Sequence, residues 1–238
     1  SAHLTVAGGI RNAGTVELLN SNAASVASAT LTVSGGGLLN LPGGIVRSVG
    51  GGGSGGRTLA AALTNQGTLA VEYPLTLSRA SAAHGNDGSV LLSGGDLTIA
   101  QSGTTPSFTN RNLVSVNLGR SLIVSGGAFI NASDGVTFVG VLGGAGTIDV
   151  STASFSNTGL ISPDGILAVT GAASFGATAR YAPHLGGTAP GTGYDRLAIS
   201  GSVNLTGALE VAFSNGFTPV GGEQFTVDRK STRLNSSH

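Results

Sequence analysis

The chain has 238 residues, and its 11 basic and 11 acidic side chains give a formal net charge of zero. Without an excess of positive charge there is no electrostatic field for nucleic acid or anionic lipid, and without any Cys there is no disulfide, thiol nucleophile or Cys-ligated metal site. Glycine supplies 41 residues and charged residues only 9%, against roughly 25% charged residues in ordinary globular domains.

The beginning of the chain, Ser1-Ala2-His3, contains no Met, and the whole sequence lacks this residue. We therefore expect a chain that is processed or belongs to a longer protein. Hydrophobic residues make up 40% of the sequence, which is enough to fold, but no apolar run approaches the roughly 18 residues of a membrane-spanning helix. Membrane insertion by this segment is not expected.

Two short phrases repeat along the chain. The first is a strand-like run that ends near glycine, as in LTVSGG and LIVSGG, and it starts at Leu4, Leu31, Leu97, Leu122, Leu167 and Leu197. Apolar and small polar residues alternate in it with period two, and β-branched residues are frequent. This pattern predicts short β-strands.

The second phrase is Asn-x-Gly followed by alternating apolar residues. It starts at Asn12, Asn65, Asn86 and Asn157, with degenerate copies at Asn110 and Gly144. We expect turns here, because Gly supplies a positive φ, while Asn tolerates the left-handed region and bonds its own backbone.

The spacing of these phrases indicates a stacked repeat. Starts at 65, 86 and 110 differ by 21 and 24 residues, and starts at 97 and 122 differ by 25. One such coil cannot bury its apolar side chains alone, whereas stacked coils bury them in continuous interior columns. The sequence therefore predicts an all-β fold, a right-handed parallel β-helix in a single elongated domain. Residues 1–162 are expected to form coils of about 21–25 residues, with residues 50–56 (GGGGSGG) as a flexible excursion.

Carboxylates are scattered along the body of the chain. They are Glu17, Glu72, Asp87, Asp96, Asp134, Asp149, Asp164, Asp195, Glu210 and Glu223. Asp87, Asp134 and Asp164 each precede Gly, which is typical of turns. The sequence shows no cluster of the kind that a two-carboxylate glycosidase or a calcium-assisted lyase requires.

Two histidines lie near other polar residues. His84 is close to Asp87 in a segment that we interpret as a turn, and His184 precedes Tyr194 and Asp195 by about ten residues. A catalytic constellation at the distal end would need an activated nucleophile, and none accompanies these residues. We expect Tyr194 and Asp195 to form a structural corner in which the carboxylate caps turn amides.

Other patterns with chemical meaning are weak. The stretch GGAGTID at Gly143 is similar to calcium-binding nonapeptides, but it occurs once and lacks the required Asp. The glycine run is followed by Arg57 and not by the Lys of a phosphate loop. The pairs Thr30/Thr32 and Thr104/Thr105 do not repeat at one register, which argues against a flat Thr face for ice or sugars. No catalytic, cofactor-binding or metal-ligating residue is predicted, and no cofactor.

The segment from Ser162 onward, SPDGILAVTG and then LGGTAPGTGYDRLAISGSVNLTGALEVAFSNGFTPVGGEQF, carries a family resemblance. It resembles the distal passenger region of bacterial autotransporters and related filamentous-haemagglutinin-like surface proteins. The matching positions are Gly186, Gly187, Thr188, Pro190, Gly191, Tyr194, Asp195, Leu197, Gly201, Leu205, Gly207, Leu209, Val211, Gly216, Phe217, Pro219, Gly222 and Phe225. The resemblance covers the last quarter and sets residues 163–227 apart as a distal passenger-like segment.

The chain ends in a short basic stretch, DRKSTRLNSSH, which contains Lys230, the single lysine of the sequence. It resembles the in-frame translation of a sequencing-library adapter. We expect residues 228–238 to be a non-native, disordered tail on a fragment of a longer protein. Without the tail, eight basic and ten acidic residues remain and the formal charge is −2.

The resemblance implies a structural role outside the cell. It implies an exported stalk or passenger with an adhesin-like role, attached to the outer membrane of a bacterium, with a translocator barrel downstream in the full-length protein. Host or neighbouring-cell glycans or proteins are its expected partners. The alternative is a carbohydrate-active β-helix enzyme, either a polysaccharide lyase or a glycosidase, which would show acidic residues that converge in a groove.

Overall fold

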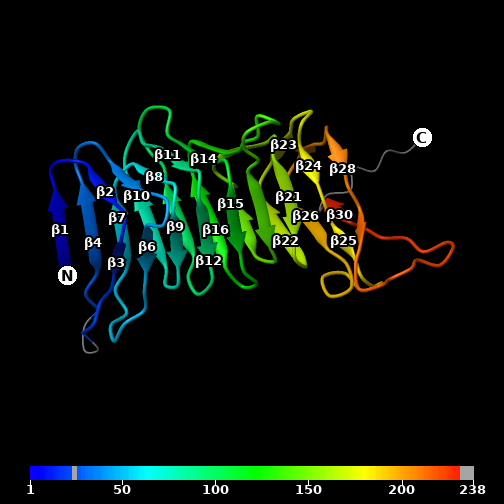
Figure 1. Cartoon of the computed structure of the whole chain (residues 1–238), viewed down its shortest axis with the longest axis horizontal. Helices are drawn as coiled ribbons and strands as arrows, with labels where there is room; N and C mark the ends of the chain where they lie inside the picture. Colours follow the sequence, from blue (N-terminus) through cyan, green and yellow to red (C-terminus); the bar gives the residue numbers. More distant parts are fainter. Residues whose placement is uncertain (23–25, 231–238) are drawn as a thin grey trace.

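The computed structural model describes residues 1–22 and 26–230, which form thirty strands and no helix. The strands are stacked along one axis in the order of the sequence, so that β1 and β30 lie at opposite ends of an elongated molecule (Figure 1). The prediction of an all-β, parallel β-helix in a single elongated domain is confirmed.

Three long sheets, named here A, B and C, make up the walls. Sheet A contains, in spatial order, β1 (Ala2–Val6), β4 (Ala29–Val33), β7 (Arg57–Ala60), β10 (Leu75–Ser78), β13 (Leu97–Ala100), β16 (Ser121–Ser125), β19 (Thr147–Asp149), β22 (Ile166–Thr170), β26 (Arg196–Ile199) and β30 (Asp228–Lys230). Sheet B contains β2 (Ile10–Asn12), β5 (Leu38–Asn40), β8 (Leu63–Asn65), β11 (Ala83–Asn86), β14 (Ser107–Asn110), β17 (Ala128–Asn131), β20 (Ser154–Asn157), β23 (Ala173–Phe175) and β27 (Val203–Asn204).

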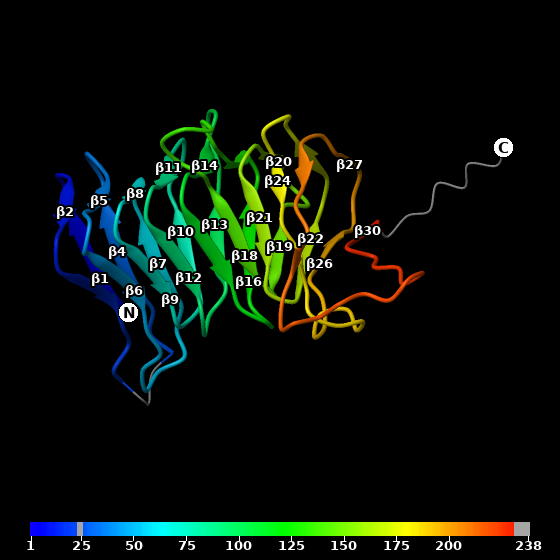
Figure 2. The same cartoon turned by 45° about the vertical axis from the view of Figure 1, so that its right-hand side comes forward.

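Sheet C contains β3 (Thr15–Leu18), β6 (Ile45–Ser48), β9 (Thr68–Val71), β12 (Ser89–Leu92), β15 (Leu113–Val116), β18 (Val141–Gly144), β21 (Leu160–Pro163), β24 (Arg180–Tyr181) and β28 (Ala208–Leu209). A small fourth sheet pairs β25 (His184–Leu185) with β29 (Ala212–Phe213). From β1 to β24, neighbours in one wall are three strands apart along the chain, as the parallel pairing of β1 with β4 and of β4 with β7 illustrates (Figure 2). At the distal end the step becomes four strands, because β25 and β29 form the small fourth sheet. The boundary expected between residues 162 and 163 falls inside β21, so sheet C runs across it.

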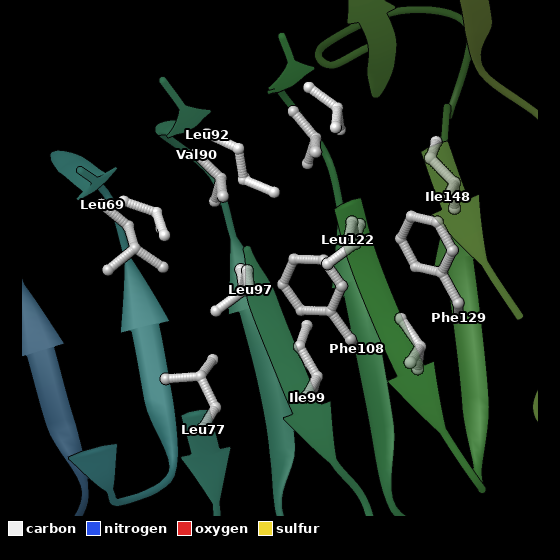
Figure 3. Packing of buried hydrophobic residues seen from close by; sticks show 14 of the residues in the cluster. Leu69, Leu77, Val90, Leu92, Leu97, Ile99, Phe108, Leu122, Phe129 and Ile148 are labelled. Atoms are coloured by element: carbon white, nitrogen blue, oxygen red, sulfur yellow. The ribbon is translucent and has the colours of Figure 1, made fainter. Parts of the chain in front are cut away.

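The core consists of columns of apolar side chains that run along the axis. In sheet C the inward column is Val16, Val46, Leu69, Val90, Val114, Leu142 and Ile161. Figure 3 shows such residues from neighbouring coils, among them Leu69, Val90 and Leu97, with their side chains directed into the space between the strands. Each column is continuous because each strand alternates inward and outward residues and the register is kept from coil to coil.

A column of buried Asn residues lies at the ends of the strands of sheet B. Its backbone conformation shows that the interpretation of Asn-x-Gly as a left-handed turn is wrong. Asn12, Asn40, Asn65, Asn86, Asn110, Asn131 and Asn157 each end a strand of sheet B. Among the described residues outside Gly, positive φ occurs at Ser81, Thr105 and Asn215, so no Asn of this column is left-handed. We call this column the Asn ladder.

The Asn ladder is held by amide-to-amide hydrogen bonds. The Nδ2 of Asn40 donates to the Oδ1 of Asn65 at 2.7 Å, and the Nδ2 of Asn65 donates to the Oδ1 of Asn86 at 2.7 Å. From Asn12 to Asn131 the amide Nδ2 also reaches a backbone carbonyl of the next coil, as from Asn86 to Leu113 at 3.0 Å. Both donors of these six amides are thereby satisfied.

The glycine two positions after the Asn is required by space, not by a positive φ. A Cβ at Gly67 would collide with the carbonyl oxygen of Gly44, and a Cβ at Gly88 would collide with that of Gly67. In these two coils the corner therefore lies directly on the corner of the coil before it, and a side chain would separate them.

Aromatic rings stack in the inward column beside the Asn ladder. The rings of Phe108 and Phe129 lie 5.5 Å apart at an interplanar angle of 14°, and those of Phe129 and Phe155 lie 5.1 Å apart at 15°. These positions are in register in β14, β17 and β20. Identical residues stack here because parallel in-register strands place the same position at every level.

Coil length varies because loops leave the corners. Consecutive members of the Asn ladder are 28, 25, 21, 24, 21 and 26 residues apart, so two coils exceed the expected 21–25. Residues 50–56 leave the corner between β6 and β7, as predicted for an excursion, and Gly53 and Gly55 within it are buried.

Of the tail that we expected to be disordered, residues 228–230 form β30, which pairs in parallel with β26, and residues 231–238 lie outside the described residues. The free edge of β26 offers backbone groups to which an extended segment can bond. Within the described part of the chain, there is no helix long and apolar enough to cross a membrane.

Candidate functional site

The scattered carboxylates mostly serve turns and surface ion pairs. Asp96 Oδ1 accepts a hydrogen bond from Ser121 N–H at 2.9 Å, and Asp149 Oδ1 accepts one from Ser151 N–H at 2.9 Å. Asp87 forms an exposed ion pair with Arg111 at 3.1 Å. Among the described residues, no group of three or more His, Cys, Asp or Glu side chains is placed to hold a metal ion.

The carboxylate of Asp134 accepts several hydrogen bonds from its own turn. The hydroxyl of Thr137 and the backbone N–H groups of Phe138, Val136 and Thr137 all donate to it. These donors hold the pKa of the Asp134 carboxyl well below its ordinary range, with the Thr137 hydroxyl as the largest cause. The prediction of a turn at Asp134-Gly135 is confirmed.

The interpretation of His84 as a turn residue beside Asp87 is wrong. His84 lies in β11, where its side chain is buried in the inward column, in register with Phe108. Its Nδ1 accepts a hydrogen bond from the backbone N–H of Leu63 at 3.2 Å. Burial lowers the pKa of His84 to about 4, so the ring is neutral at neutral pH and belongs to the core.

Arg57 also has a structural position. Its side chain is buried, its Nε donates to the carbonyl of Val49 at 3.1 Å, and its Nη1 donates to the carbonyl of Gly55. The guanidinium lies over the ring of Tyr73, 4.5 Å from the centroid. The residue after the glycine run therefore anchors that run to its own coil and presents no positive charge to a phosphate.

The outer face of sheet A carries a column of threonines that sequence reasoning missed. Thr30, Thr58, Thr76 and Thr98 occupy one register in four consecutive strands. The pair Thr104/Thr105 lies outside this column, as predicted, but the expectation that Thr30 does not repeat is wrong. A signal was available, since each of these residues directly precedes an apolar residue near the middle of a strand phrase, as in RTLA and LTLS.

The candidate site lies at the distal corner, where His184 in β25 meets Asp195 just before β26. The Nδ1 of His184 is 2.9 Å from Oδ2 of Asp195, and this oxygen also accepts the backbone N–H of His184 at 3.0 Å. Oδ1 of Asp195 accepts the N–H of Gly165 at 2.7 Å. The predicted structural corner, with a carboxylate that caps turn amides, is confirmed.

Tyr194 supports this corner from the inside. It is buried, and its ring meets the ring of Phe225 edge to face with centroids 5.4 Å apart. Phe225 meets Phe217 in the same way at 5.9 Å. These aromatic contacts hold the long segment after β29 against the last complete coil.

Two hollows adjoin the distal corner. The smaller, of about 240 Å³, is lined by polar groups that include Asp164, His184, Asp195 and Ser214. The larger, of about 710 Å³, is lined by Ser93, Ser115, Asn117, Leu118, Gly144, Ala145, Asp164, Ile166, Pro190, Gly191 and Thr192. Asp164, Gly191 and Thr192 line both, so the two hollows adjoin each other, and we call them together the lateral groove.

Small residues of sheet C lie beside the larger hollow. Ser115, which lines it, is followed by Gly143 and Ser162 as outward neighbours in the next two strands of the sheet. The rim carries hydroxyl, amide and carboxylate groups, and Asp164 is exposed between the two hollows. Such a rim can exchange hydrogen bonds with a polar ligand along its length.

The groove holds two carboxylates and a histidine but not an assembled hydrolytic set. Both oxygens of Asp195 already accept hydrogen bonds, and in the described part of the chain no hydrogen bond joins His184 to Ser214. A nucleophile must lie within hydrogen-bond reach of its base. The arrangement is therefore better suited to holding the corner and presenting polar groups than to activating a hydroxyl.

Comparisons with family models, with curated proteins and with solved structures find no match for this chain.

Proposed function

We propose that this chain is a structural stalk, or passenger, of an exported bacterial surface protein with an adhesin-like role. The observation that carries the proposal is the continuous interior, in which apolar columns and the Asn ladder run from coil to coil without a break between coils. Because neighbouring coils share their core, such a rod resists bending and holds what it carries at a distance from its anchor. The resemblance of residues 163–227 to distal passenger segments supports a position outside the cell, attached to the outer membrane.

The lateral groove and the threonine column supply contact surfaces for this role. We propose host or neighbouring-cell glycans or proteins as the partners. Hydroxyl and amide groups of Ser93, Ser115, Asn117 and Thr192 line the groove, and they match the hydrogen-bonding groups of saccharides and peptides alike.

A binding assay tests the adhesin-like role. Beads coated with the purified chain are applied to bacterial and epithelial cells and to arrays of immobilised glycans, and retained beads are counted. Asp164→Ala is expected to reduce retention severalfold, whereas Glu72→Ala, which changes an exposed carboxylate outside the groove, leaves it unchanged. Retention that is absent for the unmodified chain, or equal in both variants, contradicts a role for the groove.

A carbohydrate-active enzyme is the second candidate, and one observation favours it. Asp164 and Asp195 line the same hollow, as the paired carboxylates of a glycosidase do. Against it, both oxygens of Asp195 are engaged by the corner. Incubation with neutral and acidic polysaccharides, followed by assays for reducing ends and for unsaturated products, distinguishes the two. Product formation that disappears in Asp164→Asn would replace the stalk proposal with an enzymatic one.

A further inference from the structure

The larger hollow of the lateral groove extends along the axis of the solenoid. Four of its lining residues each come directly after the last residue of a strand of sheet C, and those last residues are aligned in register. The four are Ser93 after β12, Asn117 after β15, Ala145 after β18 and Asp164 after β21. The backbone ladder continues into them, since the N–H of Ala145 donates to the carbonyl of Val116 at 3.0 Å. The hollow therefore presents one corner position of four consecutive coils.

The loop before β26 lengthens the hollow by one more coil. Residues 190–192 of this loop line it beside Ile166 of β22. From Ser93 to the loop there are four steps between coils, which at roughly 4.8 Å each give a length of roughly 19 Å. An extended peptide covers this length with about six residues at roughly 3.3 Å each. The shape therefore suits a linear ligand that lies along the axis.

Backbone hydrogen bonds and close packing hold this loop in place. The N–H of Gly191 donates to the carbonyl of Tyr194 at 2.7 Å. The N–H of Gly193 donates to the carbonyl of Ala189 at the same distance. A Cβ at Gly191 would come within 2.8 Å of the side chain of Ile166, so the loop lies directly against β22. A preformed wall of this kind reduces the freedom that is lost on binding.

A ligand in the larger hollow cannot be bound as an additional strand of sheet C. β15 is paired with β12 and β18, and β18 is paired with β15 and β21, so these strands have no free edge. Addition to a sheet edge requires unpaired backbone groups. Side chains must therefore supply most of the recognition.

The apolar part of the lining is aliphatic. Leu118 is 82% exposed on the loop between β15 and β16, and Ile166 and Pro190 lie farther along the hollow. Among the described residues that line the larger hollow, none is aromatic, so a flat ring of a ligand has no ring on which to stack. Aliphatic side chains of a peptide can be buried against this surface.

The charge of the larger hollow is negative. Asp164 is the single charged residue among the described residues that line it, and the ion pairs found in that part of the chain do not include Asp164. Arg120, on the same loop as Leu118, donates to a backbone carbonyl and does not line the hollow. A neutral ligand would leave the carboxylate without a counter-charge, and an acidic ligand would be repelled. Charge complementarity favours a basic ligand.

We propose that the lateral groove binds an extended segment of a partner protein that carries a Lys or Arg about three positions from an aliphatic residue. The basic side chain pairs with Asp164, and the aliphatic side chain packs against Leu118. The spacing follows from the two coil steps between Asn117 and Asp164, which amount to roughly 10 Å. This inference rests on the proposed function, because it names the kind of partner that the adhesin-like role requires.

Selection from a library of random hexapeptides displayed on phage, with the purified chain as the immobilised target, tests the proposal. We expect a consensus with Lys or Arg and, about three positions away, Leu, Ile or Val. A synthetic peptide of the consensus sequence then serves as the probe in fluorescence anisotropy. Asp164→Lys is expected to weaken its binding by at least about tenfold. The same variant, used as the target of a new selection, is expected to give Asp or Glu where the unmodified chain gives Lys or Arg.

Glu72→Lys is the matched control for the charge. Glu72 is exposed directly after β9, at the same corner position one coil before Ser93, and it does not line the hollow. Leu118→Ser is expected to remove the aliphatic preference from the consensus and to keep the basic one. Val136→Ser is its control, because Val136 is 89% exposed on the loop between β17 and β18. Circular dichroism establishes that each variant is folded.

A selection without a consensus, a consensus without a basic residue, an unchanged consensus from folded Asp164→Lys, or equal weakening by Glu72→Lys would each overturn the proposal. Its failure differs from a failure of the proposed function. Retention of coated beads on cells or glycans that is lost in Asp164→Ala, without any peptide consensus, overturns this inference and leaves the adhesin-like role in place. A basic consensus without retention on cells supports the peptide preference of the groove and contradicts that role.

Discussion

The region from Asn12 to Asn157 and the distal segment 163–227 use different means to hold one solenoid together. In the first, each coil repeats the same buried amide and the same inward columns. In the second, strands shorten to two residues at β24, β25, β27, β28 and β29, and specific contacts at the Tyr194 and Asp195 corner replace the repeat. Repetition stabilises the first region through neighbouring coils, and individual side chains stabilise the second.

The point of transition is visible at Asn157. Its register partner in β23 is Phe175, so the amide of Asn157 meets a ring where every earlier member of the Asn ladder meets another amide. Among the described residues, its Nδ2 is buried without a hydrogen-bond partner. The Asn ladder therefore ends with an unsatisfied donor, at the boundary between the two regions.

The largest contrast is expected between two substitutions of Phe by Asn. Phe129→Asn removes a ring from the middle of the stack and buries an amide among apolar groups, which we expect to lower the free energy of unfolding by about 4 kcal/mol. Phe175→Asn also loses a buried ring, but its amide lies in register with the unsatisfied Nδ2 of Asn157 and is expected to cost about 2 kcal/mol less. Urea denaturation of both variants measures the difference, and equal losses would contradict the account of the Asn ladder's end.

A second pair of variants compares the middle of the Asn ladder with its last member. Asn110→Leu leaves the Nδ2 of Asn86 without its acceptor and the Oδ1 of Asn131 without its donor, and we expect a loss of about 3 kcal/mol. Asn157→Leu affects one member of the Asn ladder, Asn131, and the N–H of Gly159, which keeps the carbonyl of Asn131 as an acceptor, and it should cost about 1 to 2 kcal/mol. Thermal unfolding of the two variants side by side tests this order, and a larger loss in Asn157→Leu would reverse it.

His84 makes the stability of the repeated region depend on pH. Its pKa is about 4 in the folded chain and about 6.5 when unfolded, so the unfolded chain binds more protons between these values. The stabilising contribution is complete above pH 6.5 and is lost as the pH falls towards 4, by about 3 kcal/mol in total.

His84→Phe, which extends the stack below Phe108, is expected to remove this part of the pH dependence. His3→Gln, at an exposed position, serves as the control. Chemical denaturation at a series of pH values gives the measurement, and an unchanged slope between pH 4 and 6.5 in His84→Phe would contradict the burial of a neutral ring.

The strands and their stacking could be predicted because alternation and spacing are local properties of the sequence. The phrases LTVSGG and NQGTLAV each contain the alternating residues that form a strand and the residues that mark its boundary. The direction of the Asn side chain could not be read from the same text, because Asn-x-Gly is equally typical of a left-handed turn. What distinguishes the two readings is the stacking of corners, which depends on the coil above.

The positions of His84 and of the threonine column were missed for a related reason. His84 stands two residues before Asn86, and Leu63 and Phe108 stand in the same relation to Asn65 and Asn110. Once the Asn side chains are known to point inward, period-two alternation places all three in the core. The threonine column required the register between coils of unequal length, because Thr30, Thr58 and Thr76 have no common spacing.

A substitution at the distal corner is expected to destabilise only its surroundings, whereas a substitution in the Asn ladder is expected to lower the stability of the whole chain. Asp195→Asn removes the charge and one of the two acceptors that serve Gly165 and His184, and we expect a loss of about 1 to 2 kcal/mol. Hydrogen exchange should accelerate at the amides of these two residues and stay unchanged in the strands between β4 and β17, since distant coils share no contact with the corner. Asp149→Asn, which changes an exposed turn acceptor, should leave both amides protected. Faster exchange throughout the rod after Asp195→Asn would instead mean that the two regions unfold as one unit, and that individual contacts at the corner stabilise the repeated coils as well.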